Sequence, residues 1–390
     1  MAENTLPVDE GVQQQDGEDS PSIKAGVRKL NSNGTPAKFQ KLLSEKKPRR
    51  AAIFTHAFPD PDAISSMMAL AWLLRKSFEE IEVICFFDGV VSHPQNIAMV
   101  NLLDPEMRAV EEYKPEGWDL HFLVDTVPSH AGVGADVGED DKPVCRKVKF
   151  DCIIDHHKEQ LTPDCQGLFI NLKAGSCAAT VFHLIKKMGL KFEKTIDYDV
   201  KVATAIMVGI MTDTENLMSE DATVYESDAF ADLLELKNHS ILKQIVNYER
   251  PKYWVKKEAE AVNRAEVHEG VGVVGLGILS REHRDMISDM AQQMVSWEDV
   301  NTAVAFAIVD GHFIEGSVRS KNASTSVPIL CRQLGLDKGG EGGGKLGKGA
   351  YRYDLAGAGV EEDEEEKTKD EIWELFRKRE LLRIFKIIKK

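Results

Sequence analysis

Carboxylate and imidazole side chains stand in four short clusters along this chain, and each cluster directly follows an apolar run. The clusters are the segment His56-Ala-Phe-Pro-Asp60-Pro-Asp62, the single Asp125, the triplet Asp155-His156-His157, and Asp213. Mixed carboxylate and imidazole ligands suit manganese, iron or zinc better than calcium, which prefers oxygen alone. Two such ions about 3.5–4 Å apart, joined by a carboxylate, can activate water and bind both oxygens of a phosphoryl displacement. The four clusters contain enough ligands for two ions.

The apolar runs before these clusters indicate how the clusters are positioned. The runs cover residues 51–56, 121–125, 152–155 and 205–213. Short continuous apolar runs are typical of strands buried on both faces, which predicts a parallel sheet with helices on both of its faces. Functional groups collect beyond the carboxyl ends of such strands. A single Asp after a strand is most often a turn or cap residue, but four successive clusters favour convergence at one edge of the sheet.

A helix is expected to follow the first cluster, because apolar residues recur at helical spacing from Ala63 to Arg75. Proline fixes its own φ and disfavours the helical region for the residue before it. Pro59 and Pro61 therefore predict that Asp60 and Asp62 lie in an extended turn between strand and helix.

Composition narrows the class of protein. A hydrophobic fraction of 43% in 390 residues is sufficient for two ordinary domains. The net charge of −15 opposes binding of long nucleic acid, which depends on clustered Lys and Arg. No stretch approaches the roughly 20 apolar residues of a membrane span, and no signal pattern follows Met1, so a cytoplasmic protein is expected. The six cysteines form no C-x-x-C pair, which argues against a zinc finger or a disulfide framework.

The sequence divides into segments of different character. Polar residues dominate the start, whereas strands such as 81–87 and helices such as 178–187 alternate later, which is typical of an α/β class. We expect five segments: 1–45 disordered or loosely attached, 46–236 a metal-binding catalytic domain, 237–265 a helical connector, 266–358 a smaller α/β substrate-binding domain, and 359–390 a charged amphipathic tail.

The second domain contains a hairpin and a glycine-rich segment. Asp310-Gly311 between two apolar runs predicts a tight turn that joins antiparallel strands. Gly342-Gly343-Gly344-Lys345 is expected to form a loop that either approaches an anion or serves as a mobile linker. Arg319-Ser320 at the end of the hairpin favours the anion site, because Arg is suited to bidentate phosphate contacts. The tail is expected to pack on its own domain or a second subunit, with a membrane-surface helix as the alternative.

The ordered motifs resemble those of the DHH phosphoesterase superfamily. The resemblance rests on His56-Ala-Phe-Pro-Asp-Pro-Asp-Ala63, Leu-Val-Asp125-Thr, Asp155-His-His157 and Thr212-Asp-Thr214, and it extends to Gly316-Ser-Val-Arg-Ser320 and Gly342-Gly-Gly344 of an associated C-terminal domain. It spans roughly residues 50–355. It implies a parallel-sheet catalytic domain, a smaller α/β substrate-binding domain, and hydrolysis by two-metal activation of water.

The resemblance also implies roles for individual residues. One manganese ion would be held by His56, Asp60 and Asp125, and the other by Asp62, Asp125, His156 and Asp213, with Asp125 bridging. Asp155 would support the site and His157 would face the substrate phosphate. From the second domain, the implied substrate contacts are Arg319, Ser320, Gly342, Gly343, Gly344 and Lys345. The family usually has histidine where this chain has Lys345, and a lysine cannot reproduce the directional bonding of an imidazole.

The leading hypothesis is a manganese-dependent phosphoesterase with two divalent ions that hydrolyses short oligonucleotides or small nucleotides such as 3′-phosphoadenosine 5′-phosphate. A cyclic-dinucleotide phosphodiesterase is one alternative, and a catalytically silent nucleotide-binding regulator is another. A processive exonuclease would need an extended basic groove with aromatics, which amount to 7% here. We expect a small nucleotide or short oligonucleotide as partner, no long nucleic acid, no membrane span, and a homodimer as one arrangement open to the chain.

Overall fold

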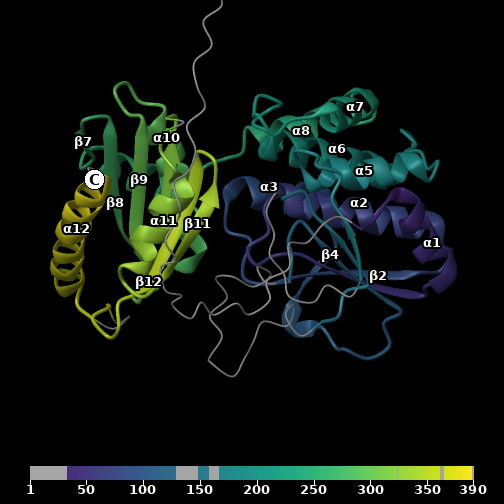
Figure 1. Ribbon diagram of the computed structural model, residues 1–390, viewed down its shortest axis with the longest axis horizontal. Helices are drawn as coiled ribbons and strands as arrows, with labels where there is room; N and C mark the ends of the chain where they lie inside the picture. Colours follow the sequence, from purple (N-terminus) through teal and green to yellow (C-terminus); the bar gives the residue numbers. More distant parts are fainter. Residues whose placement is uncertain (1–32, 129–147, 158–166, 323, 361–363, 389–390) are drawn as a thin grey trace, which may run out of the picture.

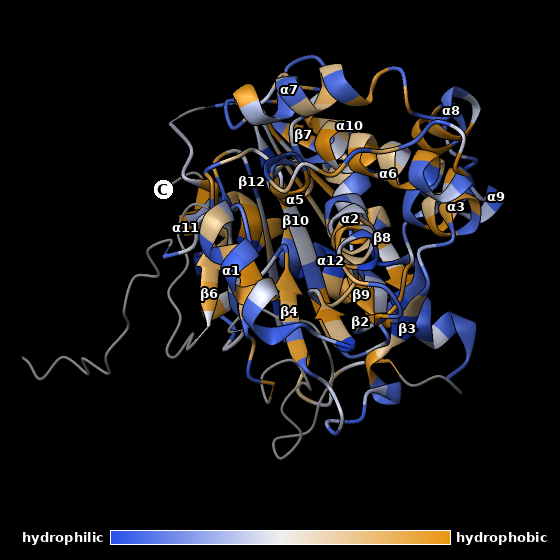
Figure 2. Ribbon diagram, turned by 90° about the vertical axis from the view of Figure 1, so that its right-hand side faces the viewer, coloured by the Kyte–Doolittle hydropathy of each residue, from blue (hydrophilic) through white to orange (hydrophobic). Residues whose placement is uncertain are grey.

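The computed structural model describes residues 33–128, 148–157, 167–322, 324–360 and 364–388. These residues form two α/β halves that lie side by side, each built on one six-stranded sheet (Figure 1). Hydrophobic residues are concentrated in the strands and on the inner sides of the helices (Figure 2). The α/β class predicted from the apolar runs is confirmed.

The first sheet is wholly parallel. Its strands in spatial order are β3 (Met107–Ala109), β2 (Glu82–Phe87), β1 (Arg50–Phe54), β4 (Leu120–Val124), β5 (Cys152–Ile154) and β6 (Leu168–Ile170). The strand order reverses between β1 and β4, and in open α/β sheets the crevice beyond the strand ends at such a reversal is the usual ligand site. The clusters that follow β1, β4 and β5 therefore share one edge of the sheet.

Helices of the first half pack mainly on one face of this sheet. They are α1 (Pro36–Lys46), α2 (Pro61–Ser77), α3 (Pro94–Leu103), α5 (Cys177–Lys187), α6 (Asp197–Asp213), α7 (Val224–Leu233) and α8 (His239–Val246). Their buried residues join one apolar cluster with alternate strand residues such as Ile53 and Phe122. The opposite face, with Phe54 and Phe86, is covered in the described residues by the 3₁₀ helix η1 (Val110–Glu112) and by aromatic rings that follow it.

Two elements of the first half differ from the expectation. The expectation that residues 1–45 are disordered or loosely attached is wrong for residues 36–45, because α1 is a capped helix whose Phe39 and Leu43 are buried. Residues 1–32 lie outside the described part of the chain. The run 205–213 was expected to be a strand, but it forms the end of α6. A buried helix and a buried strand have the same apolar composition, so periodicity alone does not separate them.

The second sheet is mixed. Its strands in spatial order are β11 (Glu341–Lys345), β12 (Lys348–Asp354), β10 (Phe313–Ser320), β9 (Thr302–Val309), β8 (Val271–Leu279) and β7 (Glu266–His268). Only β8 and β9 pair in parallel among these described strands. The turn between β9 and β10 has positive φ at Asp310 and Gly311, so the predicted tight hairpin is confirmed.

Helices cover both faces of the second sheet. One face packs against α9 (Lys252–Val262) and α10 (Met286–Val295), and the other against α11 (Val327–Leu336) and α12 (Glu366–Ile388); the 3₁₀ helix η2 (Arg281–His283) precedes α10. Trp373, Leu381 and Ile384 of α12 are buried against this sheet, so the C-terminal tail packs on its own half. None of the helices in the described ranges is long and apolar enough to span a membrane.

The two halves contact each other through α3 and α10. Ser92 Oγ hydrogen-bonds Asp285, and His93 Nε2 lies 3.1 Å from Asp289 Oδ1. The His93 ring also packs edge-on against Trp254 of α9. These contacts place β11, the edge strand of the second sheet, toward the first half (Figure 1).

Candidate metal centre

All six side chains expected to bind metal converge at the carboxyl edge of the first sheet. His56 follows β1, Asp125 directly follows β4, and His156 follows β5. Asp60 and Asp62 are supplied by the start of α2, and Asp213 is the last residue of α6.

The ligand atoms form overlapping groups within which all atoms lie within 4.8 Å of one another. One group contains His56, Asp60 and Asp125, and a second contains Asp62, His156 and Asp213. A third group joins Asp125 and His156 to His157. The structure thus brings together the six residues that the resemblance assigns to two ions, but the group of Asp62, His156 and Asp213 does not itself include Asp125.

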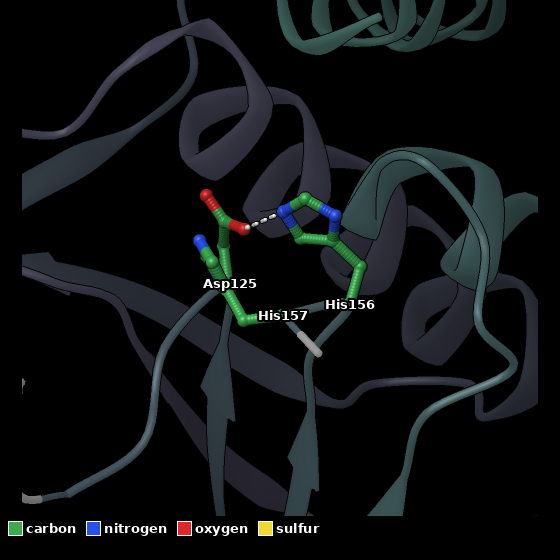
Figure 3. Close-up of side chains that lie close together, drawn as sticks. All are labelled: Asp125, His156 and His157. Carbon is green, nitrogen blue, oxygen red and sulfur yellow. Dashed lines mark ion pairs between the residues drawn. The ribbon is translucent and has the colours of Figure 1, made fainter. Parts of the chain in front are cut away.

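Asp125 lies between the two sets. Its Oδ2 is 3.6 Å from His56 Nε2, and its Oδ1 is 3.4 Å from His156 Nε2. Figure 3 shows the carboxylate of Asp125 pointing at the His156 ring, with His157 beside it. The residue is only 3% exposed and has a φ of 59°, a left-handed conformation that Asp adopts more readily than most residues. Its backbone N–H donates to Ile154 of β5, which fixes the turn.

The first turn of α2 orients the two acids of the first cluster. Asp60 is the N-cap, and its Oδ1 accepts a hydrogen bond from Ala63 N at 2.9 Å. Pro61 occupies the first helical position, where a missing N–H costs nothing. Asp62 is therefore helical, and the expectation that both acids lie in an extended turn is correct only for Asp60.

Asp62 is also bound to the start of α5. Its carboxylate accepts hydrogen bonds from the backbone N–H groups of Cys177 at 2.6 Å and Ala178 at 2.8 Å. These are unpaired donors at a helix N-terminus, where the helix dipole favours negative charge. The carboxylate is thus fixed from three sides of the site by α2, α5 and the neighbouring His156, whose Nε2 lies 3.9 Å away.

Asp213 reaches the site because α6 packs closely on α2. A Cβ at Gly209, one turn before Asp213, would approach Ser65 Oγ to 2.1 Å and Asp62 Oδ1 to 3.1 Å. The absence of a side chain at Gly209 therefore lets the two helices bring their acids together. Asp213 Oδ2 then lies 3.1 Å from His156 Nε2.

The pair Asp155 and His157 stands behind this edge. Asp155 is fully buried, and its Oδ1 lies 2.8 Å from His157 Nδ1. Burial alone would raise the pKa of Asp155, but the contact with His157 and the imidazole charges lower it. A charged Asp155 binds Nδ1 of His157, so Nε2 is the ring nitrogen that remains for other contacts.

Electrostatics in the site are dominated by buried carboxylates. Burial, together with the charges of Asp125 and Asp213, raises the pKa of Asp62 well above its ordinary value. Burial would lower the pKa values of the imidazoles, but Asp125 and Asp60 raise that of His56 to about 9, and Asp213 and Asp125 raise that of His156 to about 10. For Asp213, contact with His156 and the charge of Lys345 outweigh burial and hold the pKa well below its usual range.

These residues fit divalent cations. Asp125 Oδ1 is buried and accepts no hydrogen bond within the described residues, and an orphaned buried carboxylate oxygen is costly. Four carboxylates and two imidazoles in contact also concentrate negative charge that a cation would neutralise. The donor set of oxygen and nitrogen, without thiolate, suits manganese or a similar ion.

A cleft between the halves opens beside this centre. Its volume is about 730 Å³, and its walls include His56 and Asp60 on one side and β10, β11 and β12 on the other. Lys345, at the end of β11, directs its Nζ to within 3.6 Å of Asp213 Oδ2. The second half therefore contributes a cation to the edge of the metal centre.

The glycine segment before Lys345 is a strand, not the expected loop. Gly342, Gly343 and Gly344 belong to β11, which pairs antiparallel with β12. A Cβ at Gly342 would approach the carbonyl oxygen of Cys331 to 2.1 Å, so this glycine is needed where β11 packs on α11. A Cβ at Gly343 would meet nothing within 4 Å, and this residue lines the cleft.

Arg319 lines the cleft and Ser320 does not. Arg319 is oriented by Gln292, which accepts from Nε at 3.1 Å, and by Ser317, which accepts from Nη1 at 2.9 Å. The hydroxyl of Ser320 instead contacts Thr302 and the backbone oxygen of Asn301. Of these two residues, only Arg319 lies where the expected substrate contact requires.

Several residues that shape the site were missed from the sequence. Gly209 lies inside an apolar helix, and a glycine there is a signal of close packing. Ser176 is the N-cap of α5 and marks the helix start that binds Asp62. Phe58 and Arg284, which also line the cleft, carried no recognisable signal, because their meeting depends on how the two halves are placed.

Comparison with known proteins agrees with this geometry. Residues 50–210 match the DHH family, N-terminal domain. The chain is 27% identical over 321 residues to the uncharacterized protein MJ1633 of Methanocaldococcus jannaschii. This alignment covers 82% of this chain and 60% of that protein. It is 26% identical over 178 residues to a probable manganese-dependent inorganic pyrophosphatase of Streptococcus pyogenes. That alignment covers 45% of this chain and 51% of the pyrophosphatase.

The alignments therefore span less than two thirds of the length of these curated relatives. Among solved structures, the fold is similar to an exopolyphosphatase-related protein from Bacteroides fragilis, with a TM-score of 0.62 at 16% identity. That similarity covers 89% of this chain and 96% of the other, so it includes both halves of the fold.

Proposed function

The chain carries a DHH-family domain over residues 50–210, and on this premise we propose that it is a metal-dependent phosphoesterase that hydrolyses small nucleotides or short oligonucleotides. One observation supports the proposal above the others. Two groups of possible metal ligands, one with Asp125 and one with His156, lie beside a cleft with a cationic wall, and Asp125 Oδ1 is 3.4 Å from His156 Nε2. A site of this composition suits an anionic, phosphorylated substrate.

We infer that two ions bind here. His56, Asp60 and Asp125 would hold one, and Asp62, Asp125, His156 and Asp213 would hold the other, with Asp125 shared. Manganese is proposed because the donor set suits it and because the Streptococcus pyogenes relative is described as manganese-dependent. When bound, such ions polarise phosphoryl oxygens and lower the pKa of water.

The side chains around the ions would position the phosphate. His157, held at Nδ1 by Asp155, lies in one group with Asp125 and His156. Lys345 reaches the same region from the second half, and Arg319 lies farther along the cleft wall. We assign these three residues to binding phosphate oxygens, and Asp155 to holding the imidazole of His157 in place.

The dimensions of the cleft favour a small substrate. A volume of about 730 Å³ lies within the usual range for small-molecule sites, roughly 300–1,000 Å³. The net charge of −15 would repel a long polyanion, whereas a local cluster of Lys and Arg can still hold one or two phosphates. These two properties support a mononucleotide or dinucleotide over a long strand.

A substrate panel tests the proposal. The full chain would be assayed with manganese, magnesium, cobalt or zinc on a dinucleotide, a cyclic dinucleotide, a long single strand and 3′-phosphoadenosine 5′-phosphate. We expect turnover of the dinucleotide or the bisphosphate with manganese, and its loss in His156→Ala. Nucleotide binding without turnover in every metal would instead identify a silent regulator, and undiminished turnover in His156→Ala would refute the assignment of the site.

Inorganic pyrophosphate is the second candidate substrate. The observation in its favour is that the Streptococcus pyogenes relative is described as a probable inorganic pyrophosphatase. Pyrophosphate belongs in the same panel, and a kcat/KM for pyrophosphate far above that for every nucleotide would replace the nucleotide assignment.

A further inference from the structure

An aromatic ring and a guanidinium group face each other at the mouth of the cleft. Phe58 lies in the loop between β1 and α2, and Arg284 follows η2 in the other half. The Arg284 Cζ atom is 4.3 Å from the centroid of the Phe58 ring, and both side chains line the cavity. Phe58 is partly exposed, so a large apolar ring is presented to the cleft and not packed in the core.

The Phe58 ring is held in this position by its backbone. Its φ of 57° is unusual for a bulky residue, and such conformations persist where the surroundings enforce them, often at ligand sites. The Phe58 N–H donates to Asp88 O at 3.0 Å. A Cβ at Gly89 would approach the ring to 2.9 Å, so the glycine provides the room in which the ring lies.

Arg284 is oriented from the opposite wall by Glu315. Its Nε and Nη2 donate to Glu315 Oε2 at 3.0 and 2.8 Å. Glu315 lies on β10 and also contacts Arg352, whose guanidinium stacks on Phe313. The edge of the Arg284 guanidinium is thereby bound to Glu315, while its flat face remains directed at Phe58.

The ring lies close to the metal centre along the chain. Phe58 is two residues from His56 and two from Asp60, so its Cα is within about 7 Å of the Cα of each. A phosphate bound among the ligand side chains and a flat group on Phe58 could therefore belong to the same nucleotide.

Docking of the two halves does not depend on this pair alone. The halves already contact each other through Ser92 with Asp285 and His93 with Asp289. The stacked pair lies instead on the cavity wall, where a ligand would meet it. Arginine planes and aromatic rings are the side chains on which nucleobases stack.

We propose that Phe58 and Arg284 form a clamp for the planar base of the substrate. The base would stack on Phe58, with the guanidinium of Arg284 on its other face, after the two side chains separate by one stacking distance, roughly 3.5 Å. The inference rests on the proposed function and goes beyond it, because it assigns a base-bearing substrate and the residues that select it. Inorganic phosphates lack the group that this clamp would hold.

A matched pair of ligands tests the clamp. Adenosine 3′,5′-bisphosphate and ribose 3′,5′-bisphosphate carry the same phosphates and differ only in the base. With manganese and the full chain, we expect kcat/KM to favour the base-bearing compound by about 10-fold or more. Phe58→Leu should reduce this ratio toward one, Phe58→Trp should preserve it, and Arg284→Gln should lower it in part. Phe78→Leu, an aromatic substitution outside the cleft, should leave the ratio as in the wild type.

Each outcome decides between the clamp and a purely structural contact. A wild-type ratio near one, or an unchanged ratio in Phe58→Leu, would overturn the inference while leaving the phosphoesterase intact. If neither compound is hydrolysed, titration calorimetry of the same two compounds against wild type and Phe58→Leu tests the clamp directly; the proposed function fails only if the dinucleotide of the substrate panel is not hydrolysed either. Equal affinities of the wild type for both compounds would overturn it.

Discussion

The two walls of the cleft are constructed differently. On the first half, every ligand side chain is fixed by the end of a strand or helix, and Asp62 alone accepts two backbone hydrogen bonds from α5. On the second half, long flexible cations such as Lys345 extend from an edge strand whose packing depends on glycines. The first wall is thus preorganised for chemistry, whereas the second can adapt to the shape of its ligand. The comparison suggests that substitutions of the ligand side chains on the first wall abolish reaction, while those on the second wall change affinity and selectivity.

Asp125→Asn should have the largest effect. The amide keeps the size of the side chain and tolerates the left-handed backbone, but it removes the carboxylate that contacts both His56 and His156. We expect kcat/KM on the best substrate of the panel to fall by about 10³-fold or more, with little change in the thermal unfolding midpoint.

The matched control for this variant is Asp104→Asn. Asp104 also has a positive φ, of 52°, but it ends α3 and is exposed. It should retain wild-type turnover. Activity of Asp125→Asn within a few-fold of wild type would show that the first wall is not the reactive one.

Lys345→Ala should have an intermediate effect. Loss of a charge-assisted contact with phosphate is worth about 1.5–3 kcal/mol, so kcat/KM should fall roughly 10- to 100-fold, mostly through KM. Lys345→His should recover part of this loss if a directional donor can replace the ammonium. Lys338→Ala, an exposed lysine beyond α11, serves as the control, and wild-type kinetics in Lys345→Ala would mean that this lysine does not meet the substrate.

The smallest effects should come from the glycines of β11, and here two neighbours differ. Gly342→Ala would force a Cβ against the Cys331 carbonyl, so the free energy of unfolding should fall by about 1–3 kcal/mol. Gly343→Ala projects into open space and should change it by less than about 0.5 kcal/mol. Urea unfolding of both variants measures the contrast, and equal destabilisation would contradict the packing assigned to this strand.

The sequence predicted the first wall better than the second for a physical reason. Residues after β1, β4 and β5 must meet at one edge once a parallel sheet forms, so their types and order sufficed to predict their convergence. Asp213 does lie at this edge, but the prediction that it follows a strand is wrong. It is the last residue of helix α6, whose close approach to α2 depends on Gly209.

The second wall could not be derived in the same way. Repeated glycines between polar residues are typical of a loop, and only pairing with β12 makes Gly342–Gly344 a strand. The meeting of Phe58 with Arg284 depends on contacts between halves that no local pattern encodes.

The backbone of Asp125 has a consequence for sequence variation at this position. A left-handed φ of 59° in a buried turn is compatible with Gly, Asn and Asp but disfavours almost every other residue. Of these three, only Asp offers an ionised carboxylate with two oxygens to neighbours on both sides. The backbone conformation thus limits which residues fit at position 125, and the need for a carboxylate limits them further. We expect Asp125 to be the least substitutable residue in a deep mutational scan of the chain.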